Sequence, residues 1–301
     1  MLPPDRAHIQ TEQRNPRSQR LHALTTRECV DLIRREDAGV LAAMEAAAPA
    51  LAAFIDALIP RFERGGRLIY LGAGTSGRLG VLDASEAPPT FQLDPGRIVA
   101  IIAGGEGALR RSSEGAEDVV DGARAALVEL VLGEHDTLLG IAAGRTTPYV
   151  LGAFAIARRL APACLTGFLT CAPGETPAGV DHVISLPTGP EVLTGSTRMK
   201  AGTATKLALN TISTTLMVRT GRVYENLMVD LRATNAKLRD RAARIISSLT
   251  GLPREDALSL LDRAGNSVKL AVVMHRLRLD RPQAEAHLVR AGGRLDSAIG
   301  L

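Results

Sequence analysis

Residues 72–86 read Gly-Ala-Gly-Thr-Ser-Gly-Arg-Leu-Gly-Val-Leu-Asp-Ala-Ser-Glu and directly follow the apolar run Leu68-Ile69-Tyr70-Leu71. A short apolar run that ends in glycines is typical of a strand buried on both faces of a parallel sheet. The glycines let the backbone turn sharply and approach a ligand, and a helix that opens here aims its N–H groups into the loop. Such a site suits a phosphate. The residues predicted to hold it are Gly74, Thr75, Ser76, Gly77 and Arg78.

The glycine pattern alone leaves the ligand open. It lacks the lysine of the phosphate loop G-x-x-x-x-G-K-[ST]. It satisfies G-x-G-x-x-G, but the strand expected near 97–102 runs into Ala103-Gly104-Gly105 and lacks the acidic residue of a dinucleotide site. A loop that serves only to turn the chain remains the alternative. Glu86 adds a carboxylate on the same helix or at its end, so the stretch predicts chemistry as well as binding.

Strand-like and helical stretches alternate through the middle of the chain. The apolar runs lie near 67–72, 97–102, 137–142, 164–169 and 182–186. Continuous apolar strands between helices predict an α/β fold, with a parallel five-stranded sheet sandwiched by helices and ligands at the carboxyl ends of the strands. We expect three parts: an N-terminal arm and helices over 1–55, the sheet domain over 56–222 and a C-terminal helical region over 223–301.

The two ends of the chain have different patterns. Residues 1–24 are polar and predict an extended arm, and Thr25-Thr26-Arg27-Glu28 then predicts the cap of a helix. An alanine-rich helix is expected from about 37 to 64. The charged tail predicts short helices at 254–264, 267–277 and 281–291.

Composition excludes several classes of protein. The 301 residues are 46% hydrophobic and 23% charged, as in a soluble globular protein, whereas 3% aromatic residues and a charge of +4 do not favour nucleic-acid binding. Three cysteines without C-x-x-C spacing indicate neither a disulfide framework nor a zinc site. The start has no signal-peptide core, and no stretch approaches 18 uncharged apolar residues. We expect a cytoplasmic protein that binds no metal and no membrane.

Two further segments carry groups suited to chemistry. The segment Glu114-Gly-Ala-Glu117-Asp118 predicts the start of a helix, with the two glutamates on one face. Acidic residues in a first turn could serve only to stabilise the helix through its dipole. The segment lies at the same predicted sheet edge as Glu86, and two carboxylates beside one pocket can act as acid and base. Gly195-Ser-Thr-Arg-Met-Lys200 offers hydroxyls and two cations to an anion, although an ordinary capped helix explains it equally well.

Taken in order, several motifs resemble those of the N-acetylmuramic acid 6-phosphate etherase family. They are the segments Thr11–Pro16, Leu71–Arg78, Asp83–Pro89, Glu114–Asp118, Gly189–Thr203, Asn226–Asp230 and Thr234–Asn235. The resemblance spans nearly the whole chain. It implies a sugar isomerase (SIS) domain with a small ubiquitin-associated-like (UBA-like) helical region, a homodimer, and a phosphorylated amino sugar as substrate.

The resemblance also implies an activity and site residues. The family cleaves the D-lactyl ether of its substrate to give N-acetylglucosamine 6-phosphate and D-lactate, without metal or cofactor, in amino-sugar catabolism and cell-wall recycling. Its catalytic glutamates fall on Glu86 and Glu117. Further substrate and phosphate contacts fall on Thr147, Ser196, Thr197 and Lys200. One loop departs from the family pattern Ala-Ala-Ser-Gly-Arg-Thr-Pro, because residues 142–148 read Ala-Ala-Gly-Arg-Thr-Thr-Pro.

The expected reaction needs two proton-transfer groups. One carboxylate removes the C2 proton and the other protonates the departing lactate, after which water adds to the double bond. We favour Glu86 as the acid and Glu117 as the base, although the sequence does not fix this order. A phosphosugar isomerase and a non-catalytic sugar-phosphate sensor related to the glucokinase regulatory protein are the rival interpretations.

Overall fold

The computed structural model describes residues 5–111, 113–231, 233 and 235–300. They form two compact units. The sheet unit comprises Met1–Ser85 with Gly96–Ile212, and the C-terminal unit comprises Glu86–Pro95 with Ser213–Leu301. This division differs from the expected three parts, because the N-terminal helices join the sheet and Glu86–Pro95 joins the C-terminal helices. Thr234, part of one motif above, lies outside the described residues.

The sheet unit contains a five-stranded parallel sheet of order β2-β1-β3-β4-β5. Its strands are β1 (Leu68–Gly72), β2 (Ile98–Ile102), β3 (Thr137–Ile141), β4 (Leu165–Thr170) and β5 (His182–Ser185). All five lie within two residues of the predicted runs, so the predicted parallel sheet is confirmed. The strand order reverses between β1 and β3, and ligands of such sheets bind in the crevice outside the carboxyl ends of the strands at this switch point.

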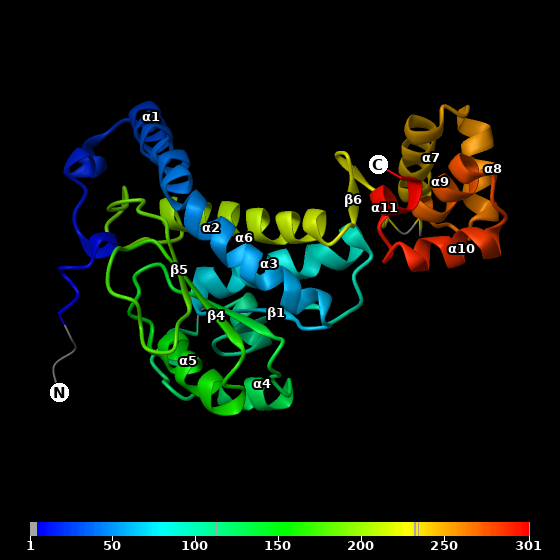
Figure 1. Cartoon of the computed structure of the whole chain (residues 1–301). Helices are drawn as coiled ribbons and strands as arrows, with labels where there is room; N and C mark the ends of the chain where they lie inside the picture. Colours follow the sequence, from blue (N-terminus) through cyan, green and yellow to red (C-terminus); the bar gives the residue numbers. More distant parts are fainter. Residues whose placement is uncertain (1–4, 112, 232, 234, 301) are drawn as a thin grey trace. The chain divides into compact units, whose positions relative to one another are not determined.

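Helices cover both faces of the sheet (Figure 1). On one face, Phe54 of α2 (Gly39–Glu63) lies against Gly167 of β4, and Tyr70 of β1 lies against Gly80 of α3 (Gly74–Phe91). On the other face, Phe154 of α5 (Pro148–Leu160) packs edge-on against Phe168, with ring centroids 5.6 Å apart. The short helix α4 (Arg124–Glu129) packs beside α5. These contacts make the predicted sandwich.

The predicted N-terminal helices are present. Thr25 and Glu28 form a reciprocal capping box at the start of α1 (Thr26–Asp37), as their spacing predicts. By length and composition alone, the stretch Thr26–Glu63 could also cross a membrane. In the sheet unit, however, Phe54 and Leu58 of α2 are fully buried. We therefore describe α2 as a core helix.

The polar composition predicted an extended N-terminal arm, and this prediction is wrong. The arm forms three short 3-10 turns, η1 (Gln10–Glu12), η2 (Pro16–Ser18) and η3 (Leu21–Ala23). Asn15 caps η2 by accepting a hydrogen bond from the Arg17 N–H, and Pro16 supplies the first residue of the turn. Ile9 and Thr11 are buried, which ties the arm to the sheet unit.

The C-terminal unit is helical apart from a small hairpin. Its elements are β6 (Val223–Tyr224), β7 (Leu227–Met228), α7 (Ala236–Thr250), α8 (Arg254–Arg263), α9 (Val268–Leu277), α10 (Arg281–Arg290) and α11 (Leu295–Ile299), and α6 (Lys200–Arg219) runs into it from the sheet unit. The three predicted short helices are confirmed. The helix α7 was not predicted, although Asn235 caps its start and Gly251 ends it in a left-handed conformation.

Candidate active site

The predicted phosphate loop is the start of a helix. Only Ala73 separates β1 from α3, which begins at Gly74 with a φ of +53°. A Cβ atom on Gly77 would lie 2.7 Å from the Gly72 carbonyl oxygen and 2.6 Å from Cγ1 of Ile102. Gly77 therefore lets the helix approach the two strands closely. The first turn places its N–H groups at the carboxyl end of β1.

We expect Gly77→Ala to lower the free energy of unfolding by about 1–3 kcal/mol, because the added methyl group must displace backbone and Ile102. Urea unfolding followed by circular dichroism measures this change. Gly39→Ala is the matched control, since an added Cβ there has no heavy atom within 4 Å. Equal stability of the Gly77→Ala variant and the wild type would contradict this role.

The first turn of α3 presents two hydroxyls. Thr75 and Ser76 are partly exposed, and in the described part of the chain neither hydroxyl has a hydrogen-bond partner. A Cβ atom on Gly202 would lie 3.5 Å from the Thr75 methyl group and 3.4 Å from the Thr197 carbonyl oxygen. The start of α3 therefore adjoins the turn Ser196–Thr197 before α6. Hydroxyls and helix N–H groups together suit an anion.

Arg78 faces a neighbouring segment. Its Nε donates to the Leu109 carbonyl at 3.2 Å, and its Nη2 donates to the Arg111 carbonyl at 3.4 Å. Leu109 ends the short turn η4 (Glu106–Leu109) after β2. Arg78 thus fixes the segment that leads from β2 toward Glu117.

Glu117 lies in an irregular segment, contrary to the predicted helix start. A single 3-10 turn, η5 (Glu114–Ala116), is followed by turns, and α4 begins only at Arg124. Gly115 and Gly122 flank this segment and disfavour helix. The Glu117 carbonyl accepts a hydrogen bond from the Tyr149 N–H at 3.0 Å, which holds Glu117 at the start of α5. Glu117 therefore lies at the carboxyl end of β3, beside the switch point.

The arginine of the altered loop after β3 turns toward the loop after β4. Arg145 has a φ of +65° and donates to the carbonyls of Ala172 and Glu175. Its guanidinium also lies over the Phe168 ring, 5.3 Å from the centroid, and burial lowers its pKa. Thr147 is the N-cap residue of α5, but its side chain makes no capping hydrogen bond. Thr147 is thus the more available of the two for an anion.

The first N–H groups of α6 and the Lys200 ammonium, predicted to bind an anion, are already bonded to protein carboxylates. The carboxylate of Glu191, which is fully buried, accepts hydrogen bonds from the N–H groups of Lys200 at 3.0 Å and Ala201 at 2.9 Å. Burial raises the pKa of Glu191, and these hydrogen bonds oppose that rise. Lys200 is 2% exposed, and its ammonium pairs with Glu36 at 2.9 Å. Lys200 is therefore committed to a buried ion pair.

Glu36 is the centre of a buried polar cluster that the sequence analysis missed. Besides Lys200, its carboxylate accepts hydrogen bonds from Asn15 at 2.8 Å and from Arg17. These partners, Arg17 foremost, lower the pKa of Glu36 to about 2. No local pattern marks Glu36, because its partners Arg17 and Lys200 are 19 and 164 residues away in the sequence.

Glu86 lies on the exposed side of α3, ten residues beyond Ser76. A rise of 1.5 Å per residue separates these two positions by about 15 Å along the helix axis. One chain therefore does not bring Glu86 to the first turn of α3.

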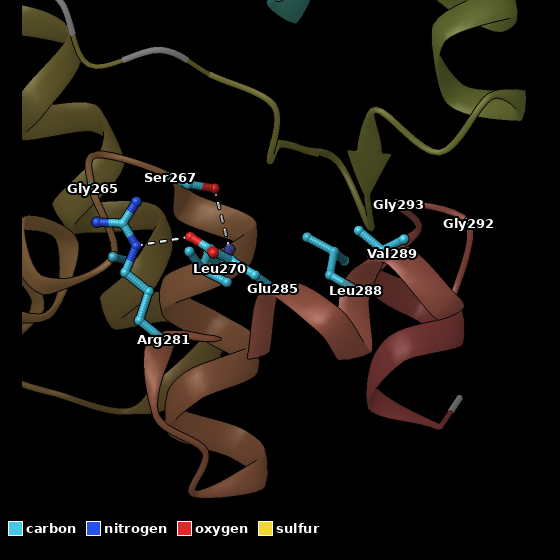
Figure 2. A pocket seen from close by; sticks show the side chains of 10 residues that line it. Gly265, Ser267, Leu270, Arg281, Glu285, Leu288, Val289, Gly292 and Gly293 are labelled. Carbon is cyan, nitrogen blue, oxygen red and sulfur yellow. Dashed lines mark hydrogen bonds and ion pairs between the residues drawn. The ribbon is translucent and has the colours of Figure 1, made fainter. Parts of the chain in front are cut away.

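A pocket of about 540 Å³ lies in the C-terminal unit and contains none of the predicted site residues. Figure 2 shows Arg281 directed toward Glu285, one turn farther along α10, with Leu288 and Val289 beyond it. The two charged side chains pair at 2.8 Å. In the residues that the structure describes, no group of three or more His, Cys, Asp or Glu side chains could hold a metal ion.

Comparison with known proteins identifies the family. Residues 50–158 match the model of the glucokinase regulatory protein N-terminal SIS domain. The N-acetylmuramic acid 6-phosphate etherase of Synechococcus sp. (strain CC9605) is 52% identical over 98% of this chain and 93% of its own length. That of Gloeobacter violaceus is 52% identical over 98% of this chain and 96% of its own length.

Among solved structures, one from Bacteroides fragilis, described as a candidate phosphosugar isomerase involved in capsule formation, matches with a TM-score of 0.49 and 19% identity. The match covers 67% of this chain and 95% of the Bacteroides fragilis chain. The identity to the two etherases runs through both units of the fold, from the arm to the C-terminal helices. The chain belongs to the N-acetylmuramic acid 6-phosphate etherase family.

Proposed function

We propose that the protein cleaves the D-lactyl ether of N-acetylmuramic acid 6-phosphate to give N-acetylglucosamine 6-phosphate and D-lactate. The observation that carries the proposal is the identity of about half the residues, over nearly the whole chain, to proteins named for this reaction. The product N-acetylglucosamine 6-phosphate would enter amino-sugar catabolism and cell-wall recycling. The enzyme is a carbon–oxygen lyase of the cytoplasm that needs neither metal nor cofactor.

The chemistry of the substrate assigns roles to the residues. The ether oxygen at C3 is β to the C1 aldehyde of the opened sugar, so loss of the acidic C2 proton expels lactate. The carboxylate of Glu117 takes that proton, and Glu86 protonates the lactate oxygen as it leaves. Water then adds to C3 with the roles reversed. Two groups with opposite tasks are needed because one carboxyl group cannot be acid and base in the same step.

The phosphate binds at the first turn of α3 and the adjoining turn before α6. The hydroxyls of Thr75, Ser76 and Ser196 and the helix N–H groups favour this placement. Gly74, Gly77 and Arg78 shape the turn, and Thr197 adjoins it. Thr147, at the start of α5, offers a further hydroxyl. Lys200 contributes through the ion pair that positions the start of α6, because its ammonium is bonded to Glu36.

The protein acts as a homodimer. The separation of about 15 Å along α3 between Ser76 and Glu86 exceeds the span of one sugar ring. Glu86 therefore does not reach a sugar whose phosphate is bound at Ser76 of the same chain. Glu86 of the partner subunit reaches the sugar instead. Analytical ultracentrifugation of the full chain tests the dimer, and a monomer that is fully active would exclude this arrangement.

The deciding experiment incubates the protein with N-acetylmuramic acid 6-phosphate and assays D-lactate. Release of D-lactate together with N-acetylglucosamine 6-phosphate supports the proposed reaction. An isomerase would instead interconvert aldose and ketose phosphates, and a sensor would bind the sugar phosphate without releasing lactate. Either of those outcomes would replace the proposal.

Ser76→Ala is expected to raise KM for the phosphorylated substrate by about 10- to 100-fold, because a hydrogen bond to a charged group contributes about 1.5–3 kcal/mol. Its kcat should change less. Initial rates of lactate release measure both constants. The control is Thr211→Ala, since Thr211 is exposed and its hydroxyl donates to the Leu207 carbonyl of its own helix, α6. Equal turnover of unphosphorylated N-acetylmuramic acid by the wild type would rule out this phosphate site.

A further inference from the structure

Glu86 lies on α3 directly after the boundary between the two units of the fold. The part of α3 that belongs to the sheet unit ends at Ser85, and Glu86–Pro95 belongs to the C-terminal unit. Before this boundary α3 is fixed within the sheet unit, because the Tyr70 hydroxyl donates to the Asp83 carboxylate at 2.8 Å. After the boundary, the helix that carries Glu86 makes its contacts within the C-terminal unit.

The turn of α3 that carries Glu86 lacks two of its helical hydrogen bonds. Pro88 and Pro89 lie inside the helix and have no N–H group, so the carbonyls four residues before each of them receive no bond from it. The Thr90 hydroxyl donates to the Glu86 carbonyl at 2.7 Å, which restrains the backbone on one side only. The helix itself therefore fixes Glu86 less firmly than it fixes its earlier turns, and contacts from outside the helix matter more.

Arg222 binds the end of α3 from outside the helix. Its Nη1 atom donates to the Phe91 carbonyl at 3.0 Å and to the Gln92 carbonyl at 3.4 Å. Phe91 is the last residue of α3 and is buried, and Gln92 has a φ of +50°, so the chain leaves the helix here. The last carbonyls of a helix have no partner within it. Arg222 supplies that partner and holds the end of α3 in one place.

A largely buried ion pair holds Arg222 in turn. One oxygen of Asp230 lies 3.4 Å from Nη1 of Arg222, and the other pairs with the Lys269 ammonium at 2.8 Å. Lys269 also donates to the Gly293 carbonyl at 2.7 Å. Burial raises the pKa of Asp230 and lowers that of Lys269, and the attraction between the two charges opposes both shifts. Buried ion pairs contribute little net stability, and their best-attested role is to fix one register of the chain.

We infer that Arg222 is a positioning residue for the reaction, because it holds the end of α3 and thereby sets where the Glu86 carboxylate lies. Asp230 and Lys269 act through Arg222. This role gives the C-terminal unit a part in catalysis, separate from the turn at the start of α3 that takes the phosphate. The inference rests on the proposed function for the catalytic role of Glu86.

A double-variant cycle on kcat tests the inference. Arg222→Met keeps the length of the side chain and removes its hydrogen-bond donors. We expect it to lower kcat for D-lactate release about 3- to 30-fold when Glu86 is present, and by less than about twofold in Glu86→Gln, where no carboxyl group is left to position. The slow release by Glu86→Gln is measured at a higher enzyme concentration. KM should stay unchanged in Arg222→Met, because the phosphate binds at the first turn of α3.

Arg276→Met is the matched control. Arg276 likewise donates to a carbonyl near the end of a helix, that of Leu249 in α7, at 3.0 Å and within the same unit. Its loss should leave kcat within about twofold of the wild type. Circular dichroism at the assay temperature gives the folded fraction of every variant. If Arg222→Met does not fold, Asp230→Asn takes its place in the cycle, because it removes the charge that holds Arg222.

Each outcome supports or overturns the inference. An equal loss of kcat with and without Glu86 would show a general structural role for Arg222 and overturn it, as would an unchanged kcat when Glu86 is present. Either result leaves the proposed function intact if the wild type releases D-lactate. A wild type that releases no D-lactate would overturn the proposed function and the inference together, and a Glu86→Gln variant with wild-type kcat would overturn the inference and the role of Glu86 alone.

Discussion

Glu117→Gln and Glu86→Gln are each expected to lower kcat for D-lactate release by about 10²- to 10⁴-fold, the usual contribution of one positioned acid or base. Glutamine keeps the size of the side chain but does not exchange protons as a carboxyl group does. The backbone contact of Glu117 with the Tyr149 N–H does not involve the side chain, so it survives the change. Steady-state assays measure kcat, and Glu106→Gln, an exposed glutamate of η4, is the control.

Solvent deuterium exchange at C2 separates the two roles. If Glu117 is the base, Glu117→Gln stops the exchange, whereas Glu86→Gln retains it and fails to expel lactate. The reverse pattern would exchange the roles. Wild-type rates in both variants would exclude the two-carboxylate mechanism and favour the sensor.

Mixing the two inactive variants tests whether Glu86 acts across the dimer. If each active site takes Glu117 from one subunit and Glu86 from the other, a mixed dimer has both substitutions in one of its sites. The other site of that mixed dimer is then intact. About a quarter of wild-type activity should return, because half of the dimers are mixed and one of their two sites works. No recovery after verified subunit exchange would place both glutamates of a site in one chain.

The sheet could be predicted because its signals are local. Runs such as Leu68–Leu71 are continuously apolar and are followed by glycines, so each buried strand is marked by its own residues. The capping box at Thr25 and Glu28 is likewise contained in four residues. By contrast, α7 was missed because its charged side chains obscure an apolar stripe that includes Ala242 and Ile246.

The candidate site could be predicted in part, because its residue types are visible but their partners are not. Gly77 was read as an approach to a ligand, whereas its neighbours are Gly72 and Ile102. Lys200 was read as a free cation, yet its partner Glu36 lies 164 residues away. The sequence shows what a side chain can do, and tertiary contacts decide whether it is available.

Glu36→Ala is expected to destabilise the protein by about 3–5 kcal/mol, the usual effect of removing one partner of a buried ion pair. It leaves the ammonium of the buried Lys200 without its ion-pair partner, and it deprives Asn15 of an acceptor. Urea unfolding at pH 7 measures the loss. Asp31→Ala is the control, because it breaks the exposed pair with Arg27 on the same helix α1, which contributes about 0.3–0.5 kcal/mol.

The double variant Glu36→Leu, Lys200→Met shows whether the unpaired charge causes the loss. Replacement of both members of a buried pair by apolar side chains often restores stability. We expect the double variant to be more stable than Glu36→Ala, although Asn15 and Arg17 of the arm lose their hydrogen bonds to Glu36 in both variants. A double variant as unstable as the single one would show that packing or the arm contact, and not the Lys200 charge, dominates.

The pH dependence of stability gives an independent measure of the same cluster. The pKa of Glu36 is lowered from 4.5 to about 2, so the folded state holds the ionised form more strongly than the unfolded chain does. The resulting stabilisation, about 3 kcal/mol at 1.36 kcal/mol per pKa unit, is complete above pH 4.5 and is lost as the pH falls toward 2. Stability curves of the wild type and Glu36→Gln should therefore differ at pH 7 and converge between pH 4.5 and 2. Curves that stay parallel through this range would show that Glu36 titrates normally and that its contacts do not hold the arm.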